Sequence, residues 1–252
     1  MNDDIGAREL ARELARLAER MALSPGPEQT AAEVVDYARQ QLDANYAGIT
    51  LVRRRGRLQT VAPTHPIVER ADLLQEELGE GPCHDNAWQC ATLVSQDLAA
   101  EPRWPAWAPM AVELGLRSAL GVELLNRAED RRLGSVNLFW TQPRSFTPDE
   151  IALAHLISRH AAIALVASYT LEGLTLALDG RKRIGQAQGI LMERHGLTEE
   201  QAFAVLKRYS QDFNVKLRDV AERLVQTKRL PDKRPVARLG EPPVDSGAAT
   251  SA

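Results

Sequence analysis

The densest gathering of reactive side chains lies between Gly79 and Cys90, a run that holds two cysteines, a histidine and an aspartate. Such groups are the usual ligands of zinc and the usual participants in covalent catalysis. Cys83 and Cys90 are seven positions apart with His84 beside the first, which is not the paired spacing of a structural zinc site, and no fourth ligand is apparent. No motif places a general base near either thiol. We therefore expect no metal site and no cofactor, and we interpret Cys83 as a packed or pocket-lining cysteine.

Large apolar side chains follow this run, and we expect them in loops that flank a sheet. Loop packing and the lining of a concave ligand pocket are both open for them. The ligand-pocket candidates are Cys83, His84, Trp88, Trp104, Trp107 and Met110. The sequence has no glycine-rich phosphate loop, no His-Glu-x-x-His, no nucleophile elbow and no kinase signature. We expect that the protein is not an enzyme.

Basic side chains are concentrated toward the C-terminus. Residues 1–169 hold 17 basic and 23 acidic side chains, whereas residues 170–235 hold 13 and 9. All five lysines lie from Lys182 onward, although arginine occurs throughout. This asymmetry favours a polyanionic partner, with a merely solvated charged face as the alternative. Asp219 and Glu222 would lie near phosphates in a DNA major groove, so single-stranded or loop RNA is the more tolerant partner.

The elements that position these groups follow from the periodicity of apolar residues. The length of 252 residues predicts one sizeable domain plus a smaller one. Short apolar runs bounded by turn residues predict a mainly antiparallel five-stranded sheet. The five runs are 47–52, 58–62, 91–95, 118–125 and 133–140. A narrow seam that includes Leu17 and Met21 predicts an N-terminal helix over 7–23, which packs against its own domain or against a second copy.

A capping box at Thr147–Glu150, with Pro148 at the first helical position, predicts the start of a long helix. From Leu153 to Arg181 its seam advances by alternating steps of four and three. This pattern favours a coiled coil between two copies, and hence a homodimer, while purely intramolecular packing stays open. Gly196 predicts the end of this helix, and a second capping box at Thr198 predicts the start of the next one. An apolar stripe over 216–227 predicts a last helix and so completes a three-helix unit.

No uncharged apolar stretch reaches the roughly 20 residues that a bilayer-spanning helix requires, and the N-terminus lacks the order of a signal peptide. We therefore expect a cytoplasmic protein with no membrane partner. After Leu230 the chain is rich in Pro, Gly, Ala, Ser and charge without periodicity, which predicts a disordered tail.

The C-terminal unit resembles the ANTAR domain, a three-helix RNA-binding module of transcription antitermination regulators. Its order and spacing match over about 50 residues, in Leu176–Arg181, Ile184–Met192, Ala202–Phe203, Leu206–Lys207 and Asn214–Ala221. The resemblance implies a dimer that holds paired stem-loops in nascent RNA and so prevents a terminator hairpin. It implies RNA contacts at Arg181, Gln188, Lys207, Asn214, Lys216 and Arg218. Gly185 and Gly189 are interpreted as allowing close helix packing, since glycine inside a helix costs roughly 1 kcal/mol.

The preceding part resembles a GAF domain of the kind found before ANTAR in actinobacterial proteins, through Gly79–Cys83, Arg103–Ala108, Leu116–Ser118 and Phe146–Glu150. That resemblance implies a sensor domain with a small-molecule ligand or none. Cyclic-nucleotide binding is not expected, because Asn137 is followed by Leu138 rather than lysine.

The expected fold class is therefore α+β, with a GAF-like antiparallel sheet flanked by helices, a long connecting helix and an ANTAR-like three-helix bundle. The expected parts are an N-terminal helix and linker at 1–28, a sensor domain at 29–169, an RNA-binding domain at 170–228 and a tail at 229–252. The expected function is RNA-binding transcription antitermination under GAF control. A DNA-binding factor that uses 198–227 as a helix-turn-helix, and a GAF ligand-binding or protein-interaction module, remain as alternatives.

Overall fold

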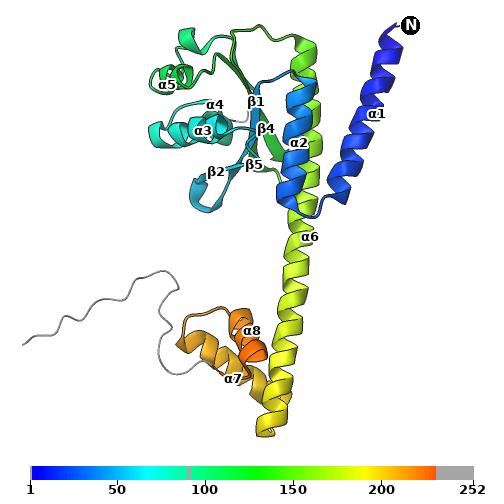
Figure 1. The fold of residues 1–252 in the computed structure, drawn as a ribbon, viewed down its shortest axis with the longest axis vertical. Helices are drawn as coiled ribbons and strands as arrows, with labels where there is room; N and C mark the ends of the chain where they lie inside the picture. The colour runs from blue at the N-terminus through cyan, green and yellow to red at the C-terminus, as the bar shows by residue number, and fades with distance from the viewer. Residues whose placement is uncertain (1, 90–91, 231–252) are drawn as a thin grey trace, which may run out of the picture. The chain divides into compact units, whose positions relative to one another are not determined.

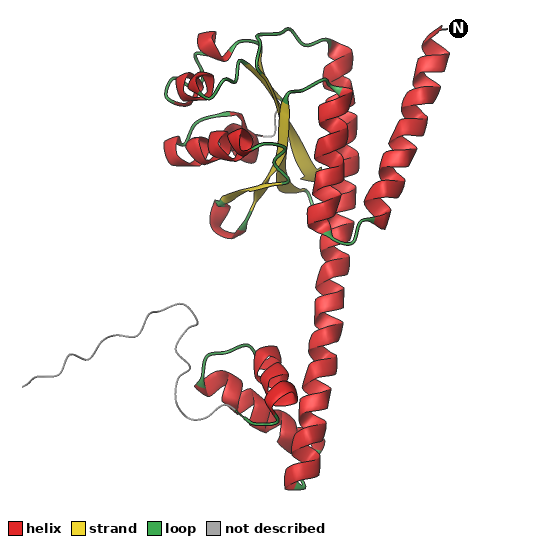
Figure 2. Ribbon diagram, in the orientation of Figure 1, coloured by secondary structure: helices red, strands yellow, loops and turns green. Residues whose placement is uncertain are grey.

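The computed structural model describes residues 2–89 and 92–230, apart from the side chains of 2–7, 9–10, 54 and 86–89 (Figures 1 and 2). Contacts divide the chain into an N-terminal unit, residues 1–172, and a C-terminal unit, residues 173–252. Apart from its first two positions, the predicted tail at 229–252 lies outside the described residues.

The N-terminal unit is built on a five-stranded antiparallel sheet with strand order β2-β1-β5-β4-β3. Its strands are β1 (Tyr46–Val52), β2 (Leu58–Val61), β3 (Leu93–Ser95), β4 (Ser118–Asn126) and β5 (Arg131–Trp140). The five predicted strands and the α+β class are confirmed. Successive side chains of a strand point to opposite faces of the sheet, and each face has its own core. Leu120 and Leu138 are buried in one core, and Ala119 and Phe139 are buried in the other.

One face of the sheet is covered by α2 (Pro27–Gln41) and the first part of α6 (Pro148–His195), and α1 (Asn2–Leu23) packs against the outer side of α2 (Figure 1). Val34 of α2 and Ile157 and Leu165 of α6 are buried in this core. Leu17 and Met21 of the predicted N-terminal seam are buried there as well. This part of the seam therefore packs within its own unit.

The opposite face carries α3 (Pro66–Leu78), α4 (Pro82–Gln89) and α5 (Trp107–Glu113), with a short 3-10 turn at Leu98–Ala100 beside α5 (Figures 1 and 2). A second 3-10 turn, Arg54–Gly56, lies in the loop that joins β1 to β2. The prediction that Trp88, Trp107 and Met110 lie in loops is wrong, because α4 and α5 are helical. Helices of eight and seven residues span only about two turns. Such short helices do not repeat the 3.6-residue period that identifies a helix in a sequence.

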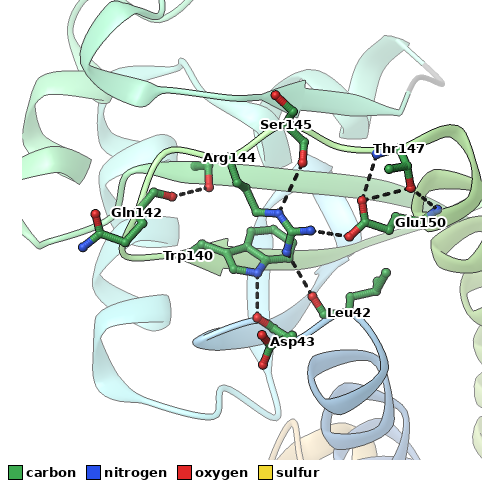
Figure 3. Close-up of polar contacts among 9 residues, drawn as sticks. Leu42, Asp43, Trp140, Gln142, Arg144, Ser145, Thr147 and Glu150 are labelled. Atoms are coloured by element: carbon green, nitrogen blue, oxygen red, sulfur yellow. Dashed lines mark hydrogen bonds and ion pairs between the residues drawn. The ribbon is translucent and has the colours of Figure 1, made fainter.

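The predicted start of the long helix is confirmed, since Thr147 and Glu150 form both hydrogen bonds of a capping box. Arg144 binds the Glu150 carboxylate and donates a hydrogen bond of 3.2 Å to the Leu42 carbonyl (Figure 3). Its guanidinium lies 4.8 Å from the ring centroid of Trp140. The Trp140 indole N–H donates a hydrogen bond of 2.7 Å to the Asp43 carbonyl. This network ties α6 to the end of α2 and to the last strand.

Replacing Arg144 with alanine is expected to lower the free energy of unfolding by about 2 kcal/mol, because it removes charge-assisted hydrogen bonds and ring contacts. Urea unfolding followed by circular dichroism measures this loss. Arg70→Ala is the control, because the 3.8 Å pair of Arg70 with Glu77 is half-exposed and worth less than about 1 kcal/mol. Equal effects of the two substitutions would contradict an anchoring role for Arg144.

The same network makes stability depend on pH. The Thr147 backbone N–H, with the Thr147 hydroxyl and Arg144, lowers the pKa of Glu150. A carboxyl whose pKa is lowered by folding stabilises the protein above its unfolded pKa, about 4.3, and loses that contribution as pH falls through the lowered folded value. Glu150→Gln should therefore reduce the steepness of acid destabilisation below pH 4.

The C-terminal unit consists of the second half of α6 with α7 (Glu199–Asp212) and α8 (Leu217–Thr227). Ala187 and Leu191 of α6, Leu206 of α7, and Ala221 and Leu224 of α8 form its buried core. The predicted three-helix unit is thus confirmed. Its two short helices are amphipathic, and they are stable by packing on α6 rather than by helix propensity alone.

Between its two cores α6 carries exposed leucines. Leu171, Leu174 and Leu178 expose 67%, 58% and 65% of their surface, at the spacing of the predicted seam. By length and composition alone, α6 is also the one helix among the described residues that is long and apolar enough to cross a membrane. Most of the residues in its most apolar stretch are not buried within the described chain. One such helix is weak evidence for a membrane segment.

Candidate nucleic-acid interface

The C-terminal unit is held in shape by local caps. Gly196 adopts a left-handed φ of 63° and ends α6, and Thr198 opens α7 with the predicted capping box. The Gln188 amide donates 3.2 Å to the Glu199 carbonyl, so this predicted RNA residue joins α6 to the start of α7. Gln188 therefore has an observed role inside the unit.

Two of the predicted RNA residues lie at the turn between α7 and α8. Asn214 lies in the turn with a left-handed φ of 49°, and Lys216 is the N-cap residue of α8. Lys207 lies on α7, three positions before Ser210, whose hydroxyl donates a 2.6 Å hydrogen bond to the Val215 carbonyl. All three predicted side chains are exposed.

A groove of about 460 Å³ lies between α6 and α8, and we call it the mixed groove. It is lined by Lys182, Arg183 and Arg218 together with the acidic residues Asp179, Asp219 and Glu222. Arg183 pairs with Glu222 at 3.3 Å and Arg218 pairs with Asp219 at 3.1 Å. Arg181, the predicted contact, is exposed on α6 but does not line this groove, whereas its neighbours Lys182 and Arg183 do.

A second groove of about 540 Å³ carries more positive charge than the mixed groove, and we call it the basic groove. It is lined by Arg194, Arg223, Lys228 and Arg229 with His195, and none of the described residues that line it is acidic. Arg194 donates to the Lys228 carbonyl and so joins the end of α6 to the end of α8. Four cations without a carboxylate attract a polyanion more strongly than the balanced mixed groove does.

None of the residues that line the basic groove is among the predicted RNA contacts, because these residues come from three separate places in the sequence. The only sequence signal was their position off the apolar stripes, which many solvated charges share. Gly185 and Gly189 also differ from expectation. No heavy atom outside the helix lies within 4 Å of a Cβ built on either, so within the described chain they allow no close helix packing. The contacts of α7 and α8 fall instead on the α6 face of Ala187 and Leu191.

The ligand-pocket candidates of the N-terminal unit are largely part of its interior. Trp104 and Trp107 are buried and meet edge to face, with ring centroids 5.6 Å apart. Their indole N–H groups donate to Asp85 at 2.8 Å and to the Ala71 carbonyl at 3.0 Å. Met110 is 36% exposed. The side chain of Trp88 lies outside the described part of the structure.

Cys83 belongs to a buried polar cluster with Asp72, while His84 beside it is half-buried. The Cys83 thiol lies 3.2 Å from an Asp72 carboxylate oxygen, and the other oxygen accepts 2.7 Å bonds from the Thr50 and Thr60 hydroxyls. Burial raises the pKa of Asp72 and, with the Asp72 charge, raises the pKa of Cys83 well above its ordinary value. A thiol held protonated in this way is a poor nucleophile. Among the described residues no group of three His, Cys, Asp or Glu side chains is placed to hold a metal ion.

Comparison with known proteins agrees with the division of the chain into an N-terminal and a C-terminal unit. Residues 24–166 match the GAF domain family and residues 172–225 match the ANTAR domain family. Over 122 residues, which is 46% of this chain, the sequence is 31% identical to a nitrate regulatory protein of Klebsiella oxytoca. The aligned part spans 31% of the length of that curated relative.

Solved structures show the same fold at low identity. A GAF domain from a Coxiella burnetii phosphoenolpyruvate-protein phosphotransferase is 17% identical with a TM-score of 0.52, over 66% of this chain and 98% of that one. The GAF domain of the Acinetobacter phosphoenolpyruvate-protein phosphotransferase is 16% identical with a TM-score of 0.50, over 62% and 92%. A bacteriophytochrome of R. palustris is 12% identical with a TM-score of 0.54, over 79% and 46%.

The fold and these matches define a two-domain protein, in which a domain built on an antiparallel sheet is followed by a helical domain. The chain belongs to the GAF domain family, whose match covers more than half of it, and it carries an ANTAR domain after the GAF domain.

Proposed function

We propose that the protein is a cytoplasmic, non-enzymatic transcription antitermination regulator that binds hairpin RNA through its ANTAR domain. The observation that carries this proposal is the basic groove, which brings Arg194, Arg223, Lys228 and Arg229 together in the domain that matches the ANTAR family. The similarity to a nitrate regulatory protein supports a regulatory role. The GAF domain would supply the signal that controls RNA binding.

The proposed regulator acts as a dimer, which pairs two ANTAR domains with two stem-loops. The exposed Leu171, Leu174 and Leu178 support this arrangement, because leucines repeated at heptad spacing are buried when two helices form a coiled coil. Pairing also explains the apolar composition of α6 without a membrane. Charged residues replacing Leu174 and Leu178 would give a monomer in light scattering if this seam is the interface.

Binding to a two-hairpin RNA and to a duplex DNA of matched length, at two salt concentrations, tests the proposal. Selective RNA binding by a dimer is the expected result. A preference for duplex DNA would instead support a helix-turn-helix reading of α7 and α8, which Asp219 and Glu222 on α8 disfavour. Absence of binding to both would support a ligand-binding or protein-interaction module.

Replacing Lys216 and Arg218 with alanine is expected to weaken RNA binding and to reduce the salt slope by about one counterion for each lost phosphate contact. Both side chains are exposed, and neither belongs to the core, so the fold should survive the change. Fluorescence anisotropy titrations across a salt series measure the slope. A slope equal to that of the unsubstituted protein would show that neither residue contacts phosphate.

A further inference from the structure

Two arginine-rich hairpins lie at the same end of the GAF sheet. Residues 53–57 join β1 to β2, residues 126–132 include the turn between β4 and β5, and together they hold seven arginines and two acidic residues. The rest of residues 1–169 holds ten arginines and 21 acidic residues. The antiparallel register pairs Leu51 with Gly134, which brings the end of β1 beside the start of β5. This end of the sheet therefore has an excess of positive charge, whereas the rest of residues 1–169 has an excess of negative charge.

These hairpins and the GAF part of α6 line an open pocket of about 290 Å³, which we call the arginine cavity. Arg53, Arg131 and Arg132 line it, and the partly exposed Leu133 and Val166 contribute apolar walls. Its size is near the lower end of the range for small-molecule sites. It lies on the face of the sheet covered by α6, not on the face that carries the buried Trp104 and Trp107.

The polar groups of the cavity are held in position. Arg53 donates hydrogen bonds of 2.7 Å to the Gln59 amide oxygen and 3.0 Å to the Tyr169 hydroxyl. Its guanidinium lies 5.4 Å from the centroid of the Tyr169 ring. The Tyr169 hydroxyl accepts from Arg53 and keeps its own O–H to donate. Arg131 pairs with Glu129 at 3.2 Å, but both side chains are more than 60% exposed, so this pair is weak and easily exchanged.

The charges that line the cavity match a dianion. Among the described residues that line the cavity, three guanidinium groups and the carboxylate of Glu129 leave a net charge of +2. Guanidinium forks bind the oxygens of phosphate groups in pairs, and a low-dielectric wall strengthens each contact. The partly exposed Leu133 and Val166 offer a surface to an apolar or aromatic group attached to the phosphate.

We propose that the arginine cavity binds a small phosphate monoester, with Arg53 and Arg132 contacting the phosphate and Tyr169 donating to it. A small molecule fits this site better than the backbone of RNA, because its volume of about 290 Å³ is roughly half that of the basic groove, about 540 Å³. The site lies entirely in the GAF domain and does not depend on RNA binding by the ANTAR domain. The bound molecule would contact α6 at Val166 and Tyr169, on the helix that continues into the ANTAR domain.

Calorimetric titration of the full chain with phenyl phosphate tests the proposal, with inorganic phosphate and phenol as partial ligands. One molecule of phenyl phosphate should bind per chain, more tightly than either partial ligand. Arg53→Gln and Arg132→Gln should each weaken this binding about tenfold, the usual size of a lost charge-assisted contact. Tyr169→Phe should weaken it less. Arg127→Gln is the matched control, because this exposed arginine lies in the same hairpin but does not line the cavity.

Two results would support the site, and the others would overturn it. Weakened phenyl phosphate binding in the cavity variants, with hairpin RNA binding retained, supports a separate small-ligand site. An equal loss of phenyl phosphate affinity in Arg127→Gln would show that binding depends on diffuse electrostatic attraction and not on the cavity. No phenyl phosphate binding, combined with weaker RNA binding in Arg53→Gln, would assign the arginines to RNA. Increased melting temperature with phenyl phosphate in the unsubstituted protein, absent in Arg132→Gln, gives a second supporting measurement.

Discussion

Gly134→Ala is expected to unfold the GAF domain or to destabilise it by at least about 3 kcal/mol. Gly134 lies in β5 between β1 and β4, next to the irregular register at Leu124 and Leu125. Its φ of 150° is rarely adopted by other residues, and a Cβ there would lie 1.8 Å from the Thr50 carbonyl oxygen. The strands would have to separate to make room for the methyl group.

The damage would extend beyond the contact itself, because Thr50 is part of the buried polar cluster. Its hydroxyl donates to Asp72 at 2.7 Å and accepts from the Asn137 amide at 2.8 Å. Moving Thr50 would leave buried polar groups without partners, which costs about 1–3 kcal/mol for each group. Urea unfolding of the full chain, followed by circular dichroism, measures the loss.

Gly173→Ala is the control for this prediction. A Cβ at Gly173 meets no atom within 4 Å, and the residue lies in the interior of α6. Alanine there should raise helix stability by up to about 1 kcal/mol. A Gly134→Ala protein within 1 kcal/mol of the original would show that β1 and β5 do not pair as described.

The double substitution Arg223→Glu and Arg229→Glu is expected to weaken binding to hairpin RNA about 100-fold at moderate salt. Each change removes a positive charge from the basic groove and replaces it with a negative one, so attraction to phosphate becomes repulsion. Neither side chain contributes to the buried core of the ANTAR domain. Anisotropy titration with a two-hairpin RNA measures the affinity, and circular dichroism checks the fold.

Charge reversal alone changes the net charge by four, so a control must separate that effect from the groove. Arg208→Glu serves this purpose, since Arg208 is exposed on α7 and lines neither groove. Arg208→Glu should weaken RNA binding by less than about threefold, because salt screens charges that are distant from the RNA. If Arg208→Glu and a single reversal at Arg223 weakened binding equally, the basic groove would have no special role.

Sequence patterns predicted most of the fold because the relevant signals are local. The capping boxes at Thr147 and Thr198 and the alternating apolar runs of the strands are each contained in a few consecutive residues. Helices α4 and α5 were missed because they are short and their residues serve specific packing, as the hydrogen bond of Trp107 to the Ala71 carbonyl shows. Local propensity has little influence where such contacts decide the structure.

The candidate site was less predictable, because it depends on how helices cross. The basic groove requires the end of α6 and the end of α8 to meet, which the hydrogen bond from Arg194 to the Lys228 carbonyl achieves. No spacing in the sequence encodes that meeting. The arginines of residues 53–57 and 126–132 likewise come together only through the pairing of β1 with β5. In both cases the residues were visible in the sequence, but their proximity was not.

The confinement of lysine to the ANTAR side of the chain has a practical consequence for labelling. Lys182, Lys207, Lys216 and Lys228 are all exposed, and no lysine occurs in residues 1–181. An amine-reactive reagent will therefore modify the ANTAR side and the chain's α-amino group, and it will leave the GAF side chains untouched. Mass spectrometry of the labelled lysines, with and without RNA, would map protection in one domain without any change to the sequence.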